Sequence, residues 1–138
     1  MRKKPSILLA DDNAAILDAV SRLLRNHQCN VVARINDGSE VVREALRLRP
    51  DIIVLDISMD TLNGIDLARE LSLSGSSSKI IFLSVHEDSD FVNAAMGAGG
   101  SAYVVKSHVA TDLCTAVDAV LADKRYLSPA MVYHTESS

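Results

Sequence analysis

The stretch Asp51-Ile52-Ile53-Val54-Leu55-Asp56 decides the fold of this 138-residue chain. Four large aliphatic residues, three of them β-branched, stand between two acidic residues. An uninterrupted apolar run of this length is typical of a strand buried on both faces, as in a parallel sheet covered by helices. Because such a strand cannot bury a carboxylate, we expect Asp56 to emerge at the carboxyl end of the strand, where α/β sheets bind ligands.

Similar apolar runs recur along the chain, and the segments between them have apolar residues at helical spacing. This alternation predicts βα units with right-handed crossovers. The fold class is therefore α/β, a doubly wound, flavodoxin-like sandwich with five parallel strands in the order 2-1-3-4-5. The five runs lie at residues 7–9, 31–32, 52–55, 80–83 and 103–105, and helices are expected after Asn13, after Asp37-Gly38, after Asn63-Gly64, from Asp88 or Ser89, and over residues 110–123.

Composition narrows the class of protein further. Hydrophobic residues make up 48% and charged residues 23% of the chain, which is enough apolar material for one globular domain. The net charge of −4 argues against direct binding of nucleic acid or of an anionic membrane. The two cysteines have no zinc-site spacing and are expected to be reduced thiols of a cytoplasmic protein. The apolar runs are too short for a signal peptide or a membrane span.

Polar residues with complementary chemistry follow four of the predicted strands. Asp11 and Asp12 follow the first, Asp56 the third, Ser84 the fourth and Lys106 the fifth. Taken singly, each of them is also an ordinary turn or strand-end residue. At one edge of a parallel sheet, however, three carboxylates repel one another unless a cation is present, and Mg²⁺ prefers such oxygen ligands. A carboxylate, Mg²⁺, a lysine and a hydroxyl together favour phosphoryl transfer to Asp56.

These residues belong to motifs in a recognisable order. The chain resembles the receiver domain of two-component response regulators, in the LuxR-type (NarL-like) branch, over about residues 6–128. The motifs that carry the resemblance are Leu9-Ala10-Asp11-Asp12-Asn13, Val54-Leu55-Asp56-Ile57-Ser58-Met59, Asn63-Gly64, Leu83-Ser84 and Tyr103-Val104-Val105-Lys106.

The resemblance implies a role for each residue of the site. Asp56 would accept a phosphoryl group from a sensor histidine kinase. Asp12 and Asp56 would bind Mg²⁺ directly with the backbone carbonyl of Ser58, and Asp11 would act largely through water. Lys106 would pair with the phosphoryl group, and Ser84 would hydrogen-bond it.

The resemblance also implies a switch and a means of setting the lifetime of the phosphoryl group. Ser84 and Tyr103 match the switch pair, which would alter the face made by the fourth helix, the fifth strand and the fifth helix. Ser58 and His86 stand two residues beyond Asp56 and Ser84, at positions that influence phosphoryl hydrolysis. A surface-loop histidine is an equally good reading of His86.

Two positions depart from the family pattern. Asp60 stands where most relatives carry proline, which predicts altered metal affinity or loop mobility. Ser107 stands where many relatives carry proline after the lysine. The cis peptide often found there is therefore in doubt, because non-proline cis bonds cost about 3 kcal/mol.

Domain organisation and partners follow from the same resemblance. Residues 1–124 are expected to form the receiver domain and residues 125–138 a tail or linker. A LuxR-type DNA-binding domain would normally follow this linker and is absent from the chain. The expected partners are a sensor histidine kinase and, on phosphorylation, a second copy of the chain. DNA would be contacted only through the absent domain, and no membrane is involved.

Two other functions stay open at this point. One is a receiver-like module that binds partners independently of phosphate, for which Asp60 is the sequence support. The other is a Mg²⁺-dependent phosphohydrolase with an aspartyl nucleophile. Such enzymes often place a second acid two residues after the nucleophile, where this chain has Ser58. The favoured reading is a regulatory phosphoacceptor, not an enzyme that turns over an external substrate.

Overall fold

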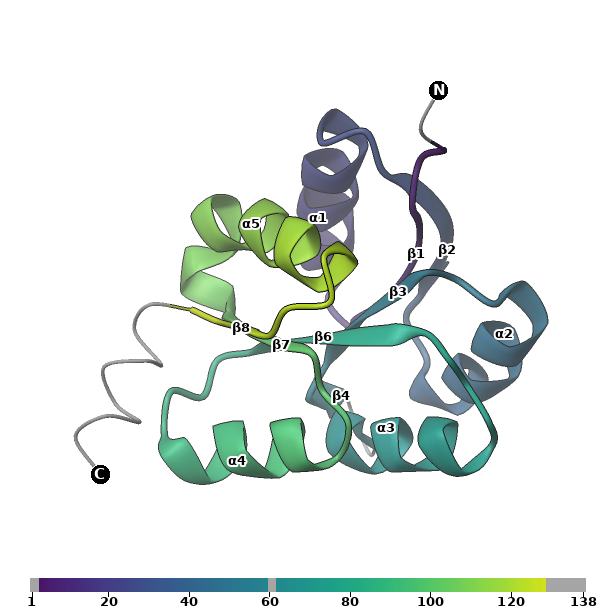
Figure 1. Ribbon diagram of the computed structural model, residues 1–138, viewed down its shortest axis with the longest axis vertical. Helices are drawn as coiled ribbons and strands as arrows, with labels where there is room; N and C mark the ends of the chain where they lie inside the picture. The colour runs from purple at the N-terminus through teal and green to yellow at the C-terminus, as the bar shows by residue number, and fades with distance from the viewer. Residues whose placement is uncertain (1–2, 60–61, 129–138) are drawn as a thin grey trace.

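The computed structural model describes residues 3–59 and 62–128 and contains one large parallel sheet. Its strands lie in the order β2-β1-β3-β6-β7-β8, and every neighbouring pair is parallel (Figure 1). The strand β3 lies inside the sheet, and its four aliphatic residues are buried, as their sequence predicts. Asp56 lies at the carboxyl end of the strand, as expected, but it is buried as well, which the sequence did not predict. The strands are β1 Ser6–Ala10, β2 Asn30–Ile35, β3 Ile52–Asp56, β6 Lys79–Ser84, β7 Ala102–Val105 and β8 Tyr126–Leu127.

The five predicted strands and their order are confirmed, and one further strand of the large sheet was not predicted. Residues Tyr126–Leu127 begin the segment that we expected to be a tail, yet they form β8 beside β7. The sheet therefore extends beyond the expected boundary at residue 124. This extension was not predicted because a two-residue strand leaves almost no periodic signal in a sequence. A second, two-stranded sheet pairs β4 (Ser58–Met59) with β5 (Leu62–Asn63) in antiparallel fashion.

Helices cover both faces of the large sheet (Figure 1). One apolar cluster packs α1 and α5 against one face, and a second packs α2, α3 and α4 against the other. None of the helices in the described ranges is both long and apolar enough to cross a membrane. The helices are α1 Ala14–Asn26, α2 Val41–Leu48, α3 Gly64–Leu73, α4 Ser89–Gly97 and α5 Val109–Leu121, with 3₁₀ turns η1 Gly38–Glu40 and η2 Lys106–His108.

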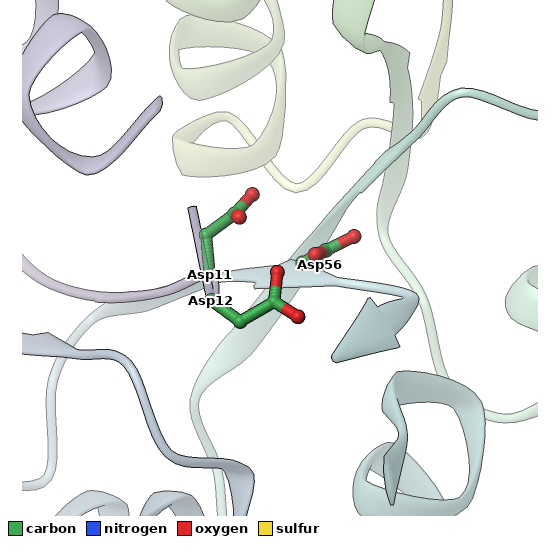
Figure 2. Close-up of side chains that lie close together, drawn as sticks. All are labelled: Asp11, Asp12 and Asp56. Carbon is green, nitrogen blue, oxygen red and sulfur yellow. The ribbon is translucent and has the colours of Figure 1, made fainter. Parts of the chain in front are cut away.

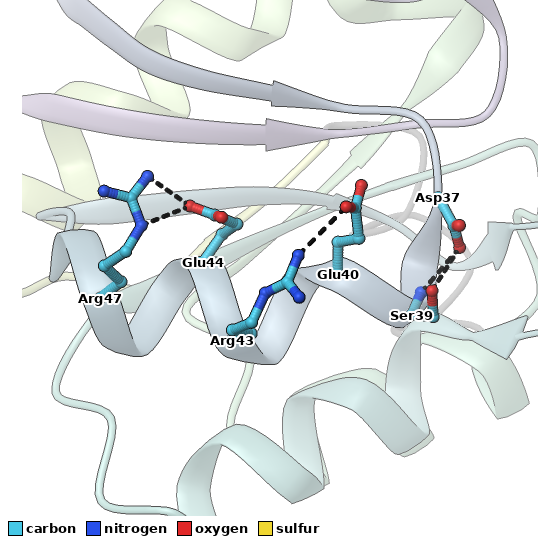
Figure 3. A network of polar contacts seen from close by, with 6 residues as sticks. All are labelled: Asp37, Ser39, Glu40, Arg43, Glu44 and Arg47. Atoms are coloured by element: carbon cyan, nitrogen blue, oxygen red, sulfur yellow. Dashed lines mark hydrogen bonds and ion pairs between the residues drawn. The ribbon is translucent and has the colours of Figure 1, made fainter.

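Three of the helices begin where the sequence predicts, and a short polar side chain caps each of them. The side chains of Asn13, Asn63 and Asp88 accept hydrogen bonds from backbone N–H groups in the first turns of α1, α3 and α4. At the start of η1 the side chain of Asp37 is the cap, whereas α2 has no side-chain cap and carries ion pairs along its surface (Figure 3). Asp37 accepts from the backbone and hydroxyl of Ser39, and the ion pairs Glu40–Arg43 and Glu44–Arg47 follow along α2.

The start of α3 packs unusually close to the end of β3. The backbone N–H of Gly64 donates to the Ile57 carbonyl at 2.7 Å. A Cβ atom added at Gly64 would lie 2.3 Å from the Asp56 carbonyl oxygen and 2.9 Å from Ile57 Cα. Both neighbours are backbone atoms that cannot rotate away, so only glycine fits. This contact holds the start of α3 against the end of β3.

We expect Gly64→Ala to lower the free energy of unfolding by about 1–3 kcal/mol, because overpacking against backbone forces the chain to shift. Gly97→Ala is the matched control, since a Cβ there would meet nothing within 4 Å. In the last position of α4 that change should be neutral or stabilising by up to about 1 kcal/mol. Urea denaturation of both variants checks this, and equal stability of Gly64→Ala and wild type would contradict it.

Candidate functional site

The polar residues predicted to meet at one edge of the sheet do meet there. Asp11 directly follows β1, Asp56 ends β3, Ser84 ends β6 and Lys106 directly follows β7. These four strands are consecutive neighbours in the sheet and run parallel, so their carboxyl ends share one edge. The topology therefore assembles the site from segments far apart in the sequence.

Three carboxylates gather around one small space (Figure 2). One oxygen from each of Asp11, Asp12 and Asp56 lies within 4.8 Å of the other two. Asp11 and Asp56 are buried, whereas Asp12 is exposed. Within this group only Asp12 opens to solvent, so the site has a wet side and a dry side.

The Lys106 ammonium lies on the dry side, between the two buried carboxylates. Its Nζ is 2.9 Å from Asp11 Oδ2 and 3.2 Å from Asp56 Oδ2. Burial lowers the pKa of Lys106, but contact with Asp11 and the charges of Asp56 and Asp11 outweigh burial, so the net shift is upward. Lys106 is therefore charged at neutral pH and neutralises part of the site.

The environment of Asp56 is less favourable to charge. Burial and the neighbouring charge of Asp11 raise the pKa of Asp56 from 3.8 to about 6. Lys106 and the Ser58 backbone N–H, which donates to Asp56 Oδ1 at 3.1 Å, oppose the increase without cancelling it. Asp56 thus remains ionised at neutral pH but is poorly compensated.

A divalent cation fits this arrangement. Asp11 Oδ2 and Asp56 Oδ2 are buried and accept no hydrogen bond from the described residues, although the Lys106 ammonium lies at ion-pair distance from both. A single lysine cannot balance three carboxylates. Hard oxygen donors clustered within 4.8 Å are the ligand set that Mg²⁺ prefers, and the exposed Asp12 leaves room for water ligands.

The predicted switch residues both bind the backbone of His86. Ser84 is buried, and its Oγ accepts from the His86 N–H at 2.9 Å. Tyr103 is fully buried, and its hydroxyl donates to the His86 carbonyl at 2.9 Å. Burial raises the pKa of this hydroxyl, which therefore stays protonated. The side chain of His86 stacks on Phe91 of α4, with ring centroids 3.9 Å apart.

The remaining positions singled out in the sequence are Ser58, Ser107 and Asp60. Ser58 is exposed and contacts Asp56 through its backbone N–H. No described peptide bond is cis, in agreement with Ser107 in place of proline. Asp60 lies outside the described residues, so its predicted effect on the site stays a prediction.

Sequence reasoning missed three contacts that support the site. It did not pair Lys106 with Asp11, did not stack His86 on Phe91, and assigned Ser128 to a tail. Ser128 is in fact fully buried, and its Oγ accepts from the Val105 N–H. The one sequence signal for this docking is the apolar pair Tyr126-Leu127 after a polar run.

Comparison with known proteins gives a consistent result. The family model described as "Response regulator receiver domain" matches residues 7–118. The chain is 30% identical over 132 residues to the transcriptional regulatory protein DegU of Brevibacillus brevis, which covers 95% of this chain and 56% of that protein. It spans 56–64% of the length of the curated relatives it matches.

Solved structures agree in fold. A LuxR-family two-component response regulator from Aurantimonas sp. SI85-9A1 superposes with a TM-score of 0.91 at 31% identity, over 98% of both chains. The isolated receiver domain of RcsB from Salmonella enterica serovar Typhimurium superposes with a TM-score of 0.87 over 96% of this chain and 99% of that chain. At 22% identity, this second likeness supports the fold alone.

The raised pKa of Asp56 predicts how stability depends on pH in metal-free buffer. The folded protein holds the Asp56 proton more tightly than the unfolded chain does, with a pKa of about 6 against 3.8. The contribution of this carboxyl to stability is present below pH 4 and is lost as pH rises through about 6.

Replacing the Asp56 carboxylate by a neutral group should remove the free-energy cost of keeping it ionised in the folded protein. At pH 7 we expect Asp56→Asn to raise the free energy of unfolding by on the order of 1–3 kcal/mol. Asp66→Asn, at an exposed ion pair on α3, is the control and should leave the pH dependence unchanged. Denaturation at pH 4.5, 6 and 7 measures both. If Asp56→Asn is less stable than the wild type at pH 7, the ionised Asp56 carboxylate does not destabilise the folded protein and the prediction is wrong.

The metal fit predicts that Mg²⁺ stabilises the folded chain, because a ligand that binds only the folded state adds to its stability. We expect millimolar Mg²⁺ to raise the melting temperature of the wild type, and Asp12→Ala to abolish most of the shift. Asp90→Ala, on the surface of α4, should keep the full shift. The idea fails if Asp12→Ala and wild type respond equally to Mg²⁺.

Proposed function

The chain belongs to the response regulator receiver domain family of two-component systems, and on that premise we propose that it is a phosphorylation-dependent signalling receiver. In this proposal Asp56 accepts a phosphoryl group from a phosphohistidine of a sensor histidine kinase. The chain then changes one of its faces and thereby controls an output.

One observation carries the proposal: a buried carboxylate at the edge of the sheet lies beside both a lysine and two further carboxylates. Asp56 is 2% exposed, 3.2 Å from the Lys106 ammonium, and grouped with Asp11 and Asp12 within 4.8 Å. Burial and Asp11 destabilise the Asp56 carboxylate, as its raised pKa indicates. An ionised carboxylate that is poorly compensated is a better nucleophile than a solvated one, and a phosphoryl group can spread its charge over several oxygens.

The reaction needs no further covalent residue. An oxygen of Asp56 attacks the phosphorus, an acyl phosphate bond forms, and the bond to the donor atom breaks with its electron pair on the donor. Lys106 is within reach of Asp56 and offsets negative charge on the transferred group. Asp11, Asp12 and Asp56, with the Ser58 carbonyl, would hold Mg²⁺, which when bound neutralises charge on the phosphoryl oxygens.

The switch part of the proposal rests on Ser84, Tyr103 and His86. Ser84 Oγ accepts from the His86 N–H and still has its own hydrogen to donate to a phosphoryl oxygen. Because Tyr103 also binds His86, a shift of Ser84 would be felt by the tyrosine through one peptide unit. The ring of His86, fixed on Phe91 of α4, would carry the shift to that helix and also restrict water near the phosphoryl group. The face of α4, β7 and α5 would then change.

The output is proposed by analogy with relatives. DegU is a transcriptional regulatory protein, and the Aurantimonas structure is of a LuxR-family response regulator. We propose transcription regulation through a separate DNA-binding domain, with homodimer formation on phosphorylation. A cytoplasmic location is part of the proposal, because Cys29 and Cys114 are free thiols, which persist in reducing compartments.

The alternatives are less well supported. The phosphate-independent module depends on Asp60, outside the described residues, and gains no support from the ordered acidic site. Phosphohydrolases with an aspartyl nucleophile often place a second acid two residues beyond the nucleophile, but this chain has Ser58 there, and its backbone N–H donates to Asp56 Oδ1. The phosphate-independent module also gives no reason for the position of Lys106 between Asp11 and Asp56.

We expect acetyl phosphate with Mg²⁺ to add one phosphoryl group to the wild type, seen as a single mass shift in intact mass spectrometry. Asp56→Asn should abolish the shift, because the amide is not a nucleophile of this kind. Asp51→Asn is the matched control. Asp51 lies at the opposite end of β3, where it accepts a hydrogen bond from the Ser6 N–H, and its replacement should leave labelling intact.

Labelling of Asp56→Asn at the wild-type rate would overturn the proposal. Equal partner binding by wild type and Asp56→Asn would favour the phosphate-independent module. Multiple turnover of an ordinary phosphomonoester would favour the phosphohydrolase.

A further inference from the structure

Ser128 continues the sheet for one step beyond β8. In β8, Tyr126 and Leu127 lie opposite Ala102 and Tyr103 of β7. At Ser128 the backbone N–H donates to the Tyr103 carbonyl at 2.9 Å, and the side-chain Oγ accepts from the Val105 N–H at 3.1 Å. Ser128 is fully buried, so water does not replace either bond. One residue thus supplies both a donor and an acceptor to the outer side of β7.

The two hydrogen bonds of Ser128 go to residues of β7 that matter for the site. Tyr103 belongs to the proposed switch, and Val105 directly precedes Lys106. The pairing of β7 with β6 ends at Val105, opposite Ser84, so hydrogen bonds to β6 do not hold the backbone at Lys106. The turn η2 then begins without a side-chain cap. Ser128 is therefore the partner that holds Val105 on the side away from β6.

Lys106 depends on a well-fixed backbone because its side chain is long and has many rotamers. The side chain is only 17% exposed and must reach Asp11 and Asp56 together. A small displacement of the Val105–Lys106 peptide would move the ammonium away from one of the two carboxylates. Geometric precision of this kind strongly affects rates when a charge must be in place before the reaction.

We propose that Ser128 is a positioning residue for the phosphoryl-transfer site: its hydroxyl and backbone N–H clamp β7 and thereby hold the Lys106 ammonium between Asp11 and Asp56. The kinetic part of this inference rests on the proposed function of Asp56. The positional part concerns Lys106 alone. The Tyr126–Ser128 segment thus belongs to the site's support and not to a passive linker.

The test compares the full chain with three serine variants. Ser128→Ala removes the acceptor for Val105, and Ser128→Thr keeps a hydroxyl at the same place. Ser78→Ala is the matched control, because the Ser78 hydroxyl donates to the Pro50 carbonyl at 2.6 Å at the opposite end of the sheet. Each variant is assayed at a temperature at which circular dichroism shows it to be folded.

We expect Ser128→Ala to lower the maximal rate of acetyl phosphate labelling in Mg²⁺ by on the order of 10-fold. Ser128→Thr should restore most of the rate, and Ser78→Ala should label as the wild type does. A folded Ser128→Ala with the wild-type rate would overturn the inference. So would an equal loss in Ser78→Ala, or a failure of Ser128→Thr to label faster than Ser128→Ala.

A second measurement separates this inference from the proposed function. The ion-paired Lys106 ammonium should give a slowly exchanging NMR signal, assigned by its disappearance in Lys106→Arg. Ser128→Ala should broaden or shift this signal, and Ser78→Ala should not. If the wild type accepts no phosphoryl group but the signal responds in this way, the proposed function fails and the positioning role stands. An unchanged signal in Ser128→Ala overturns the positioning role whatever the labelling shows.

Discussion

The arrangement of the molecule depends on one ammonium placed between two buried carboxylates. Lys106 lies 2.9 Å from Asp11 and 3.2 Å from Asp56, and these three residues lie at the carboxyl ends of three different strands. Burying two carboxylates this close is costly unless positive charge is at hand. The strand order places β1 beside β3 and β7 two positions from β3. One long lysine side chain after β7 can therefore reach both carboxylates. The order of the strands therefore decides which charges meet at the edge of the sheet. One lysine beside three carboxylates leaves part of the negative charge uncompensated.

Much of this could be predicted from the sequence because the strongest patterns are also those with large physical effects. The run Ile52–Leu55 has no polar residue, so it had to be a buried strand, and Asp56, which follows it, had to be at the edge of the sheet. Three helices begin directly after Asn13, Asn63 and Asp88 because these side chains satisfy N–H groups that would otherwise lack partners. Grouping Asp11, Asp12 and Asp56 needed only the direction of parallel strands.

The parts that could not be predicted depend on contacts between segments that carry no local pattern. β8 has two residues and no periodicity, so only its contact with Tyr103 and Ala102 makes it a strand. The stacking of His86 on Phe91 requires the loop after β6 to turn onto α4, which depends on bonds from Ser84 and Tyr103. The pairing of Lys106 with Asp11 depends on a rotamer, which no spacing rule specifies. For His86 and Lys106 the backbone path was predictable and the side-chain partner was not, whereas for β8 the backbone path itself was not predicted.

The short strand β8 also bears on the solubility of the chain. β7 reads Ala-Tyr-Val-Val, has no charged residue and is buried throughout, so its free edge would be a template for strands of other molecules. The edge at β2 is different, since it carries Asn30 and Arg34 and alternates between exposed and covered positions. Two residues of β8 and the hydroxyl of Ser128 occupy the vulnerable edge. A chain cut at residue 124 would keep every acidic residue of the site and would still present an uncovered apolar strand, which is a route to aggregation.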